Sequence, residues 1–99
     1  MLEIRDIQQA VRATAQKYGL TKVTLFGSFA RGDAHEDSDV DFLVETSAPL
    51  GFARGAIYNE LEASLNRPVD IVFGVQNLYP FIRDAVDSGG IVLYEARDV

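Results

Sequence analysis

The chain has 99 residues, of which 47% are hydrophobic and none is cysteine. This length predicts a single domain, residues 1–99, and the composition excludes disulfides and thiolate metal sites, as fits a cytoplasmic protein. The formal net charge of −6 argues against direct binding of long nucleic acids. No apolar run approaches the ~20 residues of a membrane span. The first residues also lack the pattern of a signal peptide.

The first third of the chain predicts a helix, a strand and a short helical turn. Apolar side chains recur at spacings of three and four between about residues 3 and 18, as in an amphipathic helix, and Gly19 suits its C-terminal end. The run KVTLF at 22–26 is typical of a short strand. Residues 28–32 predict a brief helical turn that leads into a polar loop.

A second strand and a second helix follow this loop. Residues 39–45, DVDFLVE, alternate acidic and apolar side chains, as a half-buried strand does. Ile57, Leu61 and Leu65 are spaced by four and predict a helix. Pro68 ends that helix, because proline removes a helical hydrogen bond.

The last third of the chain predicts a strand, a helix and a closing strand. The strand is VDIVF at 69–73, and Pro80 is tolerated in the first turn of the helix. The glycines in 88–90 end this helix, and IVLYE at 91–95 is the last strand. The apolar face of the helix comprises Leu78, Phe81, Ile82, Ala85 and Val86. The order α-β-α-β-α-β-α-β predicts an α/β (α+β) fold with one sheet covered by helices.

The dipeptide Gly27-Ser28 lies where the first strand passes into the short helical turn. A helix N-terminus points backbone N–H groups outward, glycine permits close approach of a phosphate, and the serine hydroxyl adds a donor. The same dipeptide is also common in ordinary turns, with serine as N-cap. Arg31 is equally open: it faces a phosphate, holds a nearby carboxylate, or is a solvated arginine on a short helix.

Three acidic residues interrupt apolar strands. Asp39 and Asp41 are two apart on one strand, so their side chains share a face opposite the apolar one. Asp70 interrupts the run PVDIVF in the same way. If the two strands are neighbours, the three carboxylates form one cluster that could hold two Mg²⁺ ions for an in-line phosphoryl displacement. Taken singly, each acid could equally be an ordinary residue on an exposed strand face.

The polar loop before this pair carries further charge. Asp33, Glu36 and Asp37 are interpreted as solvated loop residues, and His35 as a loop residue rather than a ligand or base. Ser38, next to the acidic pair, caps the loop or holds an aspartate carboxylate.

The whole string resembles the signature of the DNA polymerase β-like nucleotidyltransferase superfamily, and most closely its prokaryotic minimal nucleotidyltransferases (MNT). The likeness covers nearly the whole chain, without departure at the signature positions. These positions are Gly27-Ser28-x-x-Arg31-Gly32, five residues, Ser38-Asp39-x-Asp41, Val44, and the third aspartate Asp70. The resemblance implies the nucleotidyltransferase fold, with a small mixed sheet of about four strands.

The resemblance also implies residue roles. Asp39 and Asp41 would ligate two Mg²⁺ ions, and Asp70 would ligate the catalytic ion and help to activate the acceptor hydroxyl. Gly27 and Ser28 would hold the β- and γ-phosphates of a nucleoside triphosphate. Arg31 and Ser38 belong to the nucleotide-binding set with less defined roles.

Family members of this size imply a partner. They pair with a helical HEPN-domain protein as toxin and antitoxin, and the MNT member can transfer AMP from ATP to a tyrosine hydroxyl of the HEPN ribonuclease. The expectation is therefore a Mg²⁺-dependent adenylyltransferase antitoxin in a hetero-oligomer with its toxin. Two alternatives stay open: a non-catalytic antitoxin that neutralises its partner by contact, and nucleotide transfer onto RNA.

Two groups of side chains outside the signature are ambiguous. Arg54, Tyr58 and Asn59 could face a nucleotide or a partner, but an ordinary surface of a helix is the favoured interpretation. Tyr79 and Phe81 could be partner-binding aromatics, and core packing is favoured for Phe81.

Overall fold

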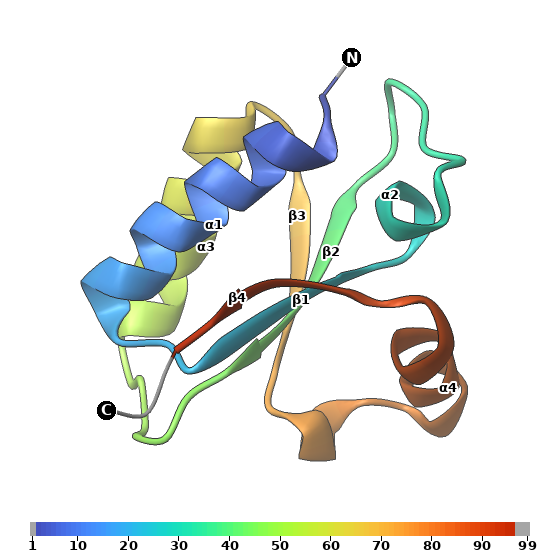
Figure 1. The fold of residues 1–99 in the computed structure, drawn as a ribbon. Coiled ribbons are helices and arrows are strands. Elements are labelled where there is room, and N and C mark those ends of the chain that lie inside the picture. The colour runs from blue at the N-terminus through green and yellow to red at the C-terminus, as the bar shows by residue number, and fades with distance from the viewer. Residues whose placement is uncertain (1, 97–99) are drawn as a thin grey trace.

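The computed structural model describes residues 2–96, and the elements follow the expected order (Figure 1). They are α1 (Ile4–Tyr18), β1 (Lys22–Phe26), α2 (Ser28–Arg31), β2 (Val40–Glu45), α3 (Ala53–Leu65), β3 (Val69–Phe73), the 3₁₀ helix η1 (Val75–Asn77), α4 (Pro80–Gly89) and β4 (Ile91–Glu95). The helix η1 was not expected, since three residues are too few to show a period. β2 begins one residue later than predicted, with the bond from Val40 N to Pro68 O.

The four strands form one mixed sheet in the order β3-β2-β1-β4. β1 runs antiparallel to both of its neighbours, and β2 runs parallel to β3. Parallel neighbours need a crossover connection, and α3 supplies it. The prediction of a small mixed sheet covered by helices is therefore confirmed.

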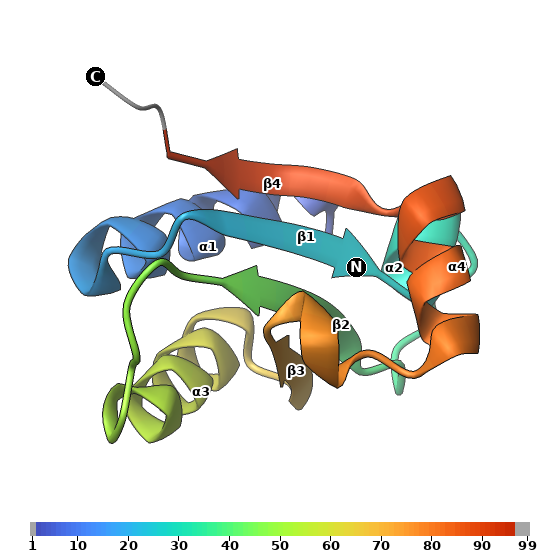
Figure 2. The ribbon, with the colours of Figure 1, turned by 90° about the horizontal axis from the view of Figure 1, so that it is seen from below.

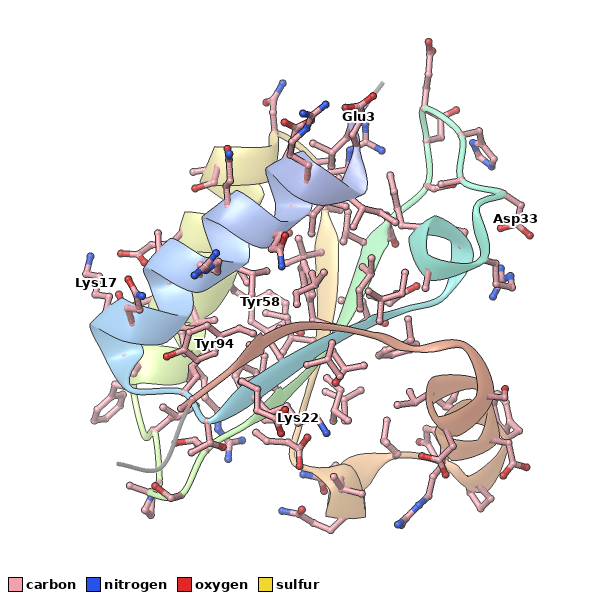
Figure 3. All side chains as sticks on the ribbon, viewed as in Figure 1. Glu3, Lys17, Lys22, Asp33, Tyr58 and Tyr94 are labelled. Carbon is pink, nitrogen blue, oxygen red and sulfur yellow. The ribbon has the colours of Figure 1, made fainter. Side chains whose placement is uncertain are left out.

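The main core lies between the sheet and the helices α1 and α3, which pack side by side on one face (Figures 1 and 2). The predicted residues Ile57, Leu61 and Leu65 of α3 are all buried there. Phe42, at the centre of β2, is fully buried. The cluster also includes Ile7, Val11 and Ala15 of α1, Val23 and Leu25 of β1, and Val40 and Val44 of β2. Lys17, labelled in Figure 3 on α1, pairs with Glu60 of the neighbouring helix α3.

The helix α4 packs against the other face of the sheet, and only loosely. It has no buried residue of its own, although Ile82 and Val86 are half-buried. Phe81 is 71% exposed, so the expectation that it packs in the core is wrong. Successive helix positions are about 100° apart, and α4 turns Ile82 toward the sheet and Phe81 toward solvent.

Tyr58 connects α3 to the edge strand β3 (Figure 3). Its hydroxyl donates to Ile71 O at 3.2 Å and accepts from Ile71 N at 3.1 Å. The interpretation of Tyr58 as ordinary helix surface is therefore wrong, because β3 has an unpaired outer edge that this hydroxyl satisfies. Arg54 and Asn59 are exposed as expected, with Arg54 over the ring of Phe73.

None of the helices within residues 2–96 combines the length and the apolar character that a membrane span requires.

Candidate active site

The site lies where β1 ends, because three strands place acidic or glycine residues side by side there. Phe26, the last residue of β1, is paired with Asp41 of β2, and Asp41 is paired with Asp70 of β3. Directly paired residues on adjacent strands point their side chains to the same face. The expectation that β3 lies beside β2 and brings Asp70 to the other two acids is confirmed at the level of the strands.

Gly27 has a conformation and a neighbour that exclude other residues. Its φ of 76° and ψ of −153° lie in a region open only to glycine. A Cβ atom at Gly27 would also overlap the carboxylate of Asp41. The sequence suggested glycine for the approach of a phosphate; the contact with Asp41 gives a second reason that lies within the chain itself.

The three carboxylates differ in environment. Asp39 and Asp70 are exposed, whereas Asp41 of β2 is half-buried, with its carboxylate against Gly27. Burial raises the pKa of Asp41 to about 6, and the charges of Asp70 and Asp39 add to the shift, while Arg31 opposes it. Near neutral pH the cluster therefore holds an unfavourable excess of negative charge, which a bound cation would relieve.

One cavity of about 390 Å³ collects all seven residues that the sequence singled out. Phe26, Ile82 and Ala85 complete its apolar wall, the last two from α4. Its lining from the signature comprises Gly27, Ser28, Arg31, Ser38, Asp39, Asp41 and Asp70. A larger cavity of about 450 Å³, between the β2–α3 loop and the end of β3, has none of these residues and no cluster of acids. The chemistry of the site therefore belongs to the smaller cavity.

Arg31 and Ser38 make local contacts at the rim. Arg31 Nε donates to Asp33 Oδ2 at 3.2 Å, and both side chains are about 60% exposed. Figure 3 shows Asp33 beyond the end of α2. Ser38 Oγ accepts from His35 N at 2.9 Å, so of the two roles expected for Ser38 the structure shows the cap of the loop. His35 Nδ1 accepts from Asp37 N, so His35 is a loop residue as expected.

Arg67 supports the site from outside the cavity lining, and the sequence interpretation missed it. Its Nη1 donates to Ser38 O at 3.3 Å, and its guanidinium lies 5.1 Å from the ring centroid of Phe29. It thus connects the start of β3 to the loop before Asp39 and to α2. Its Nε is buried and makes no hydrogen bond within the described residues. The only signal in the sequence is an arginine three residues before Asp70, which does not tell where the side chain lies.

The acidic residues fit magnesium in combination with a substrate. Within residues 2–96, no three acidic or histidine side chains are arranged to hold a metal ion by themselves. Mg²⁺ usually binds one or two carboxylates together with substrate phosphates, so a complete cage of protein ligands is not required. The oxygen donors of Asp39, Asp41 and Asp70, and the raised pKa of Asp41, suit such a hard cation.

The fold and the site define an enzyme that transfers a phosphorus-containing group. A glycine-serine turn faces paired acids in a cavity at one end of a mixed sheet, an arrangement suited to positioning a phosphate chain with a divalent cation. Residues 7–93 match the family model of the nucleotidyltransferase domain. The chain belongs to this family, and the prediction of a nucleotidyltransferase enzyme is confirmed.

Two proteins of known name or structure are similar to this chain. The protein adenylyltransferase MntA of Thermococcus cleftensis is 38% identical over 79 residues, which cover 73% of this chain and 78% of the relative. The crystal structure of a mutant of the toxin–antitoxin MntA-HpeT is similar with a TM-score of 0.70 and 26% identity, over 98% of this chain and 76% of the other.

A third protein shares the fold. It belongs to a complex of the tri-AMPylated Shewanella oneidensis HEPN toxin with an MNT antitoxin. The TM-score is 0.67 at 20% identity, and the match covers 91% of this chain and 71% of the other. The expected nucleotidyltransferase fold is thus confirmed.

Proposed function

We propose that this chain transfers AMP from ATP to a hydroxyl group, that of a tyrosine, on a partner HEPN ribonuclease toxin, in a reaction that depends on Mg²⁺. It would thereby act as the antitoxin of that toxin. The observation that carries this proposal is the in-register pair Asp41 and Asp70 beside Gly27-Ser28, with Asp39 in the same cavity.

The residues of the cavity would divide the work of the transfer. Gly27 and Ser28 hold the β- and γ-phosphates of ATP, and Asp39 and Asp41 hold the divalent cations. Bound Mg²⁺ would neutralise charge on the triphosphate and lower the pKa of the attacking hydroxyl. Asp70 would ligate the catalytic ion and help to activate the acceptor hydroxyl by taking up its proton. The hydroxyl oxygen then bonds to the α-phosphorus, the bond from the α-phosphorus to the bridging oxygen of the β-phosphate breaks, and pyrophosphate leaves.

Three observations support a protein as the acceptor. Asp39 and Asp70 are exposed, so a hydroxyl of a second macromolecule can reach the acids. The relative from Thermococcus cleftensis is named a protein adenylyltransferase, and the structural neighbour at 26% identity is a toxin–antitoxin pair. The net charge of −6 favours a basic protein over RNA as the acceptor.

Transfer of label from α-phosphate-labelled ATP tests the proposal. The HEPN-domain protein from the same genome is incubated with Mg²⁺, labelled ATP and either this chain or its Asp39→Asn/Asp41→Asn variant. We expect label on a tyrosine of the HEPN protein with the natural chain only. Equal labelling by the double variant would refute the proposed roles of the acids. A stable complex without label would favour neutralisation of the toxin by contact. Label on RNA would show that the acceptor is RNA rather than a protein.

A further inference from the structure

Two exposed aromatic rings stand at the start of α4. Tyr79 and Phe81 are each 71% exposed, and their rings stack with centroids 6.2 Å apart and an angle of 10° between the planes. Single exposed apolar residues are ordinary, but two adjacent rings form a preformed apolar patch. Burying such rings against another molecule would remove a large apolar area from water. The pair is therefore suited to a contact with another molecule.

The aromatic pair lies next to the active site along the same helix. Ile82 and Ala85, which follow Phe81 by one and four residues, line the cavity that holds the three acids. A helix rises about 1.5 Å per residue, so Phe81 and Ala85 are about 6 Å apart along the axis. A molecule that covers the pair thus also reaches the mouth of the cavity.

The surroundings of this patch carry mostly negative charge. The exposed acids of the cavity mouth, the preceding loop and α4 are Asp39, Asp70, Asp33, Glu36, Asp37, Asp84 and Asp87. Arg31 is paired with Asp33, and Arg83 is the basic residue of α4. Such a rim repels nucleic acid phosphates and attracts a basic protein surface.

We infer that Tyr79 and Phe81 are the docking site for the acceptor protein of the proposed transfer. The inference rests on the proposed function. The acceptor covers the two rings with apolar side chains and meets the acidic rim with basic ones. This contact places its acceptor hydroxyl at the mouth of the cavity, beside Asp70. The loosely packed helix α4 thereby serves as wall of the active site and as partner-binding surface at once.

Binding of the purified HEPN-domain protein tests the docking site. Its dissociation constant is measured by calorimetry for the natural chain, for Tyr79→Ala/Phe81→Ala and for Phe52→Ala. Phe52 is fully exposed at the start of α3 and lines neither cavity, so it is a matched control for the loss of an exposed ring. We expect the double variant to bind at least tenfold more weakly and Phe52→Ala to stay within twofold. Unchanged binding by the double variant, or equal weakening by Phe52→Ala, would overturn the inference.

Three further measurements separate the possible failures. Binding of ATP with Mg²⁺, followed by thermal shift, should be equal in all three proteins, which also shows that each is folded. Asp84→Lys/Asp87→Lys should slow association with the HEPN protein about tenfold at low salt, whereas no change would remove the role of the acidic rim. Light scattering reports self-association, and a dimer that Tyr79→Ala/Phe81→Ala dissolves would assign the patch to a second copy instead.

Failure of the docking site and failure of the proposed transfer give different results. Binding through the aromatic pair without AMP transfer would keep the docking site and refute the proposed chemistry. If Tyr79→Ala/Phe81→Ala transfers AMP with an unchanged KM for the HEPN protein, the proposed chemistry stands and the docking site is refuted. If the natural chain does not bind the HEPN protein, that protein is neither the acceptor of AMP nor the molecule that docks on the aromatic pair.

Discussion

At Gly27, backbone and side-chain requirements coincide. The residue has a positive φ, and its missing Cβ leaves the space that the carboxylate of Asp41 occupies. Gly27→Ala would strain the backbone, at a cost of about 1–3 kcal/mol, and would displace Asp41. We expect AMP transfer to fall at least a hundredfold. Gly32→Ala is a suitable control, because that glycine also has positive φ but no atoms lie near its Cβ position. A variant at Gly27 that keeps its activity would contradict this argument.

The raised pKa of Asp41 predicts a pH-dependent stability. The folded value is about 6 and the ordinary value is 3.8, so the folded state binds more protons between these limits. The free energy of unfolding should therefore fall as the pH rises from about 4 to 6, by about 1–2 kcal/mol for a half-exposed group. Asp41→Asn should remove this fall and be more stable than the natural chain at pH 7.

Urea unfolding without divalent cations, at pH 4, 5, 6 and 7, checks this prediction. Asp87→Asn, on the exposed surface of α4, controls for the loss of one negative charge. Curves for the natural chain and Asp41→Asn that stay parallel across this range would show that burial and the neighbouring acids do not raise the pKa of Asp41 in the folded state.

Arg67 connects three segments that carry site residues. Its hydrogen bond to Ser38 O and its contact with Phe29 relate the loop before Asp39 to α2. We expect Arg67→Ala to lower kcat for AMP transfer about tenfold with little change in KM for the partner, because the acids shift while the docking surface is untouched. Arg67→Lys should restore little, since lysine lacks the planar group that stacks on the ring. A drop in stability with unchanged kcat would assign Arg67 a purely structural part.

At the scale of the elements, hydrophobic periodicity predicted where the helices and strands lie but not how they contact one another. The spacing of Ile57, Leu61 and Leu65 located α3, and the alternation around Asp41 gave β2 and the face of its acids. Periodicity reports which face is apolar but not how tightly a helix covers the sheet. This explains why Phe81, within the apolar pattern of α4, was wrongly expected in the core.

The sequence also did not predict the long-range polar contacts of α3. Tyr58 and Ile71 are 13 residues apart, and nothing in either local pattern indicates that a phenol would pair with a backbone. Likewise, Asp70 could be assigned to a strand face, but its position beside Asp41 depended on the order of the strands. The sequence therefore predicted which residues form the site. It did not predict that Arg67 supports them.

The role of Tyr58 can be measured at the level of the edge strand. Tyr58→Phe keeps the ring against Phe73 but leaves Ile71 N and O without their partner. We expect the free energy of unfolding to fall by about 1–2 kcal/mol, with AMP transfer at saturating ATP unchanged. Tyr18→Phe, which removes a hydroxyl that donates to Glu60, is a matched control on α1 and should cost less because it removes one hydrogen bond rather than two. Equal losses in the two variants would show that the edge of β3 has no special need of Tyr58.

The whole molecule is asymmetric about its sheet. The face covered by α1 and α3 holds the continuous core, whereas α4, on the other face, has no buried residue. The cavity lies under this lightly packed helix, so part of the molecule's stability should depend on what fills the cavity. A nucleotide that bridges α2, the strand ends and α4 would join the two halves.

Ligand binding should accordingly raise the melting temperature, and only when the cation is present. At a concentration of ATP one hundred times its Kd, binding adds about 2.7 kcal/mol, which corresponds to roughly 10 °C or more in a domain of this size. Chelation of Mg²⁺ should abolish most of the shift, because Asp39, Asp41 and Asp70 would then repel the triphosphate. Asp39→Asn/Asp41→Asn should show little shift with Mg²⁺, and the Phe52→Ala variant a full one. A shift that persists under chelation would mean that the nucleotide binds without the acids, and the proposed division of roles within the cavity would be wrong.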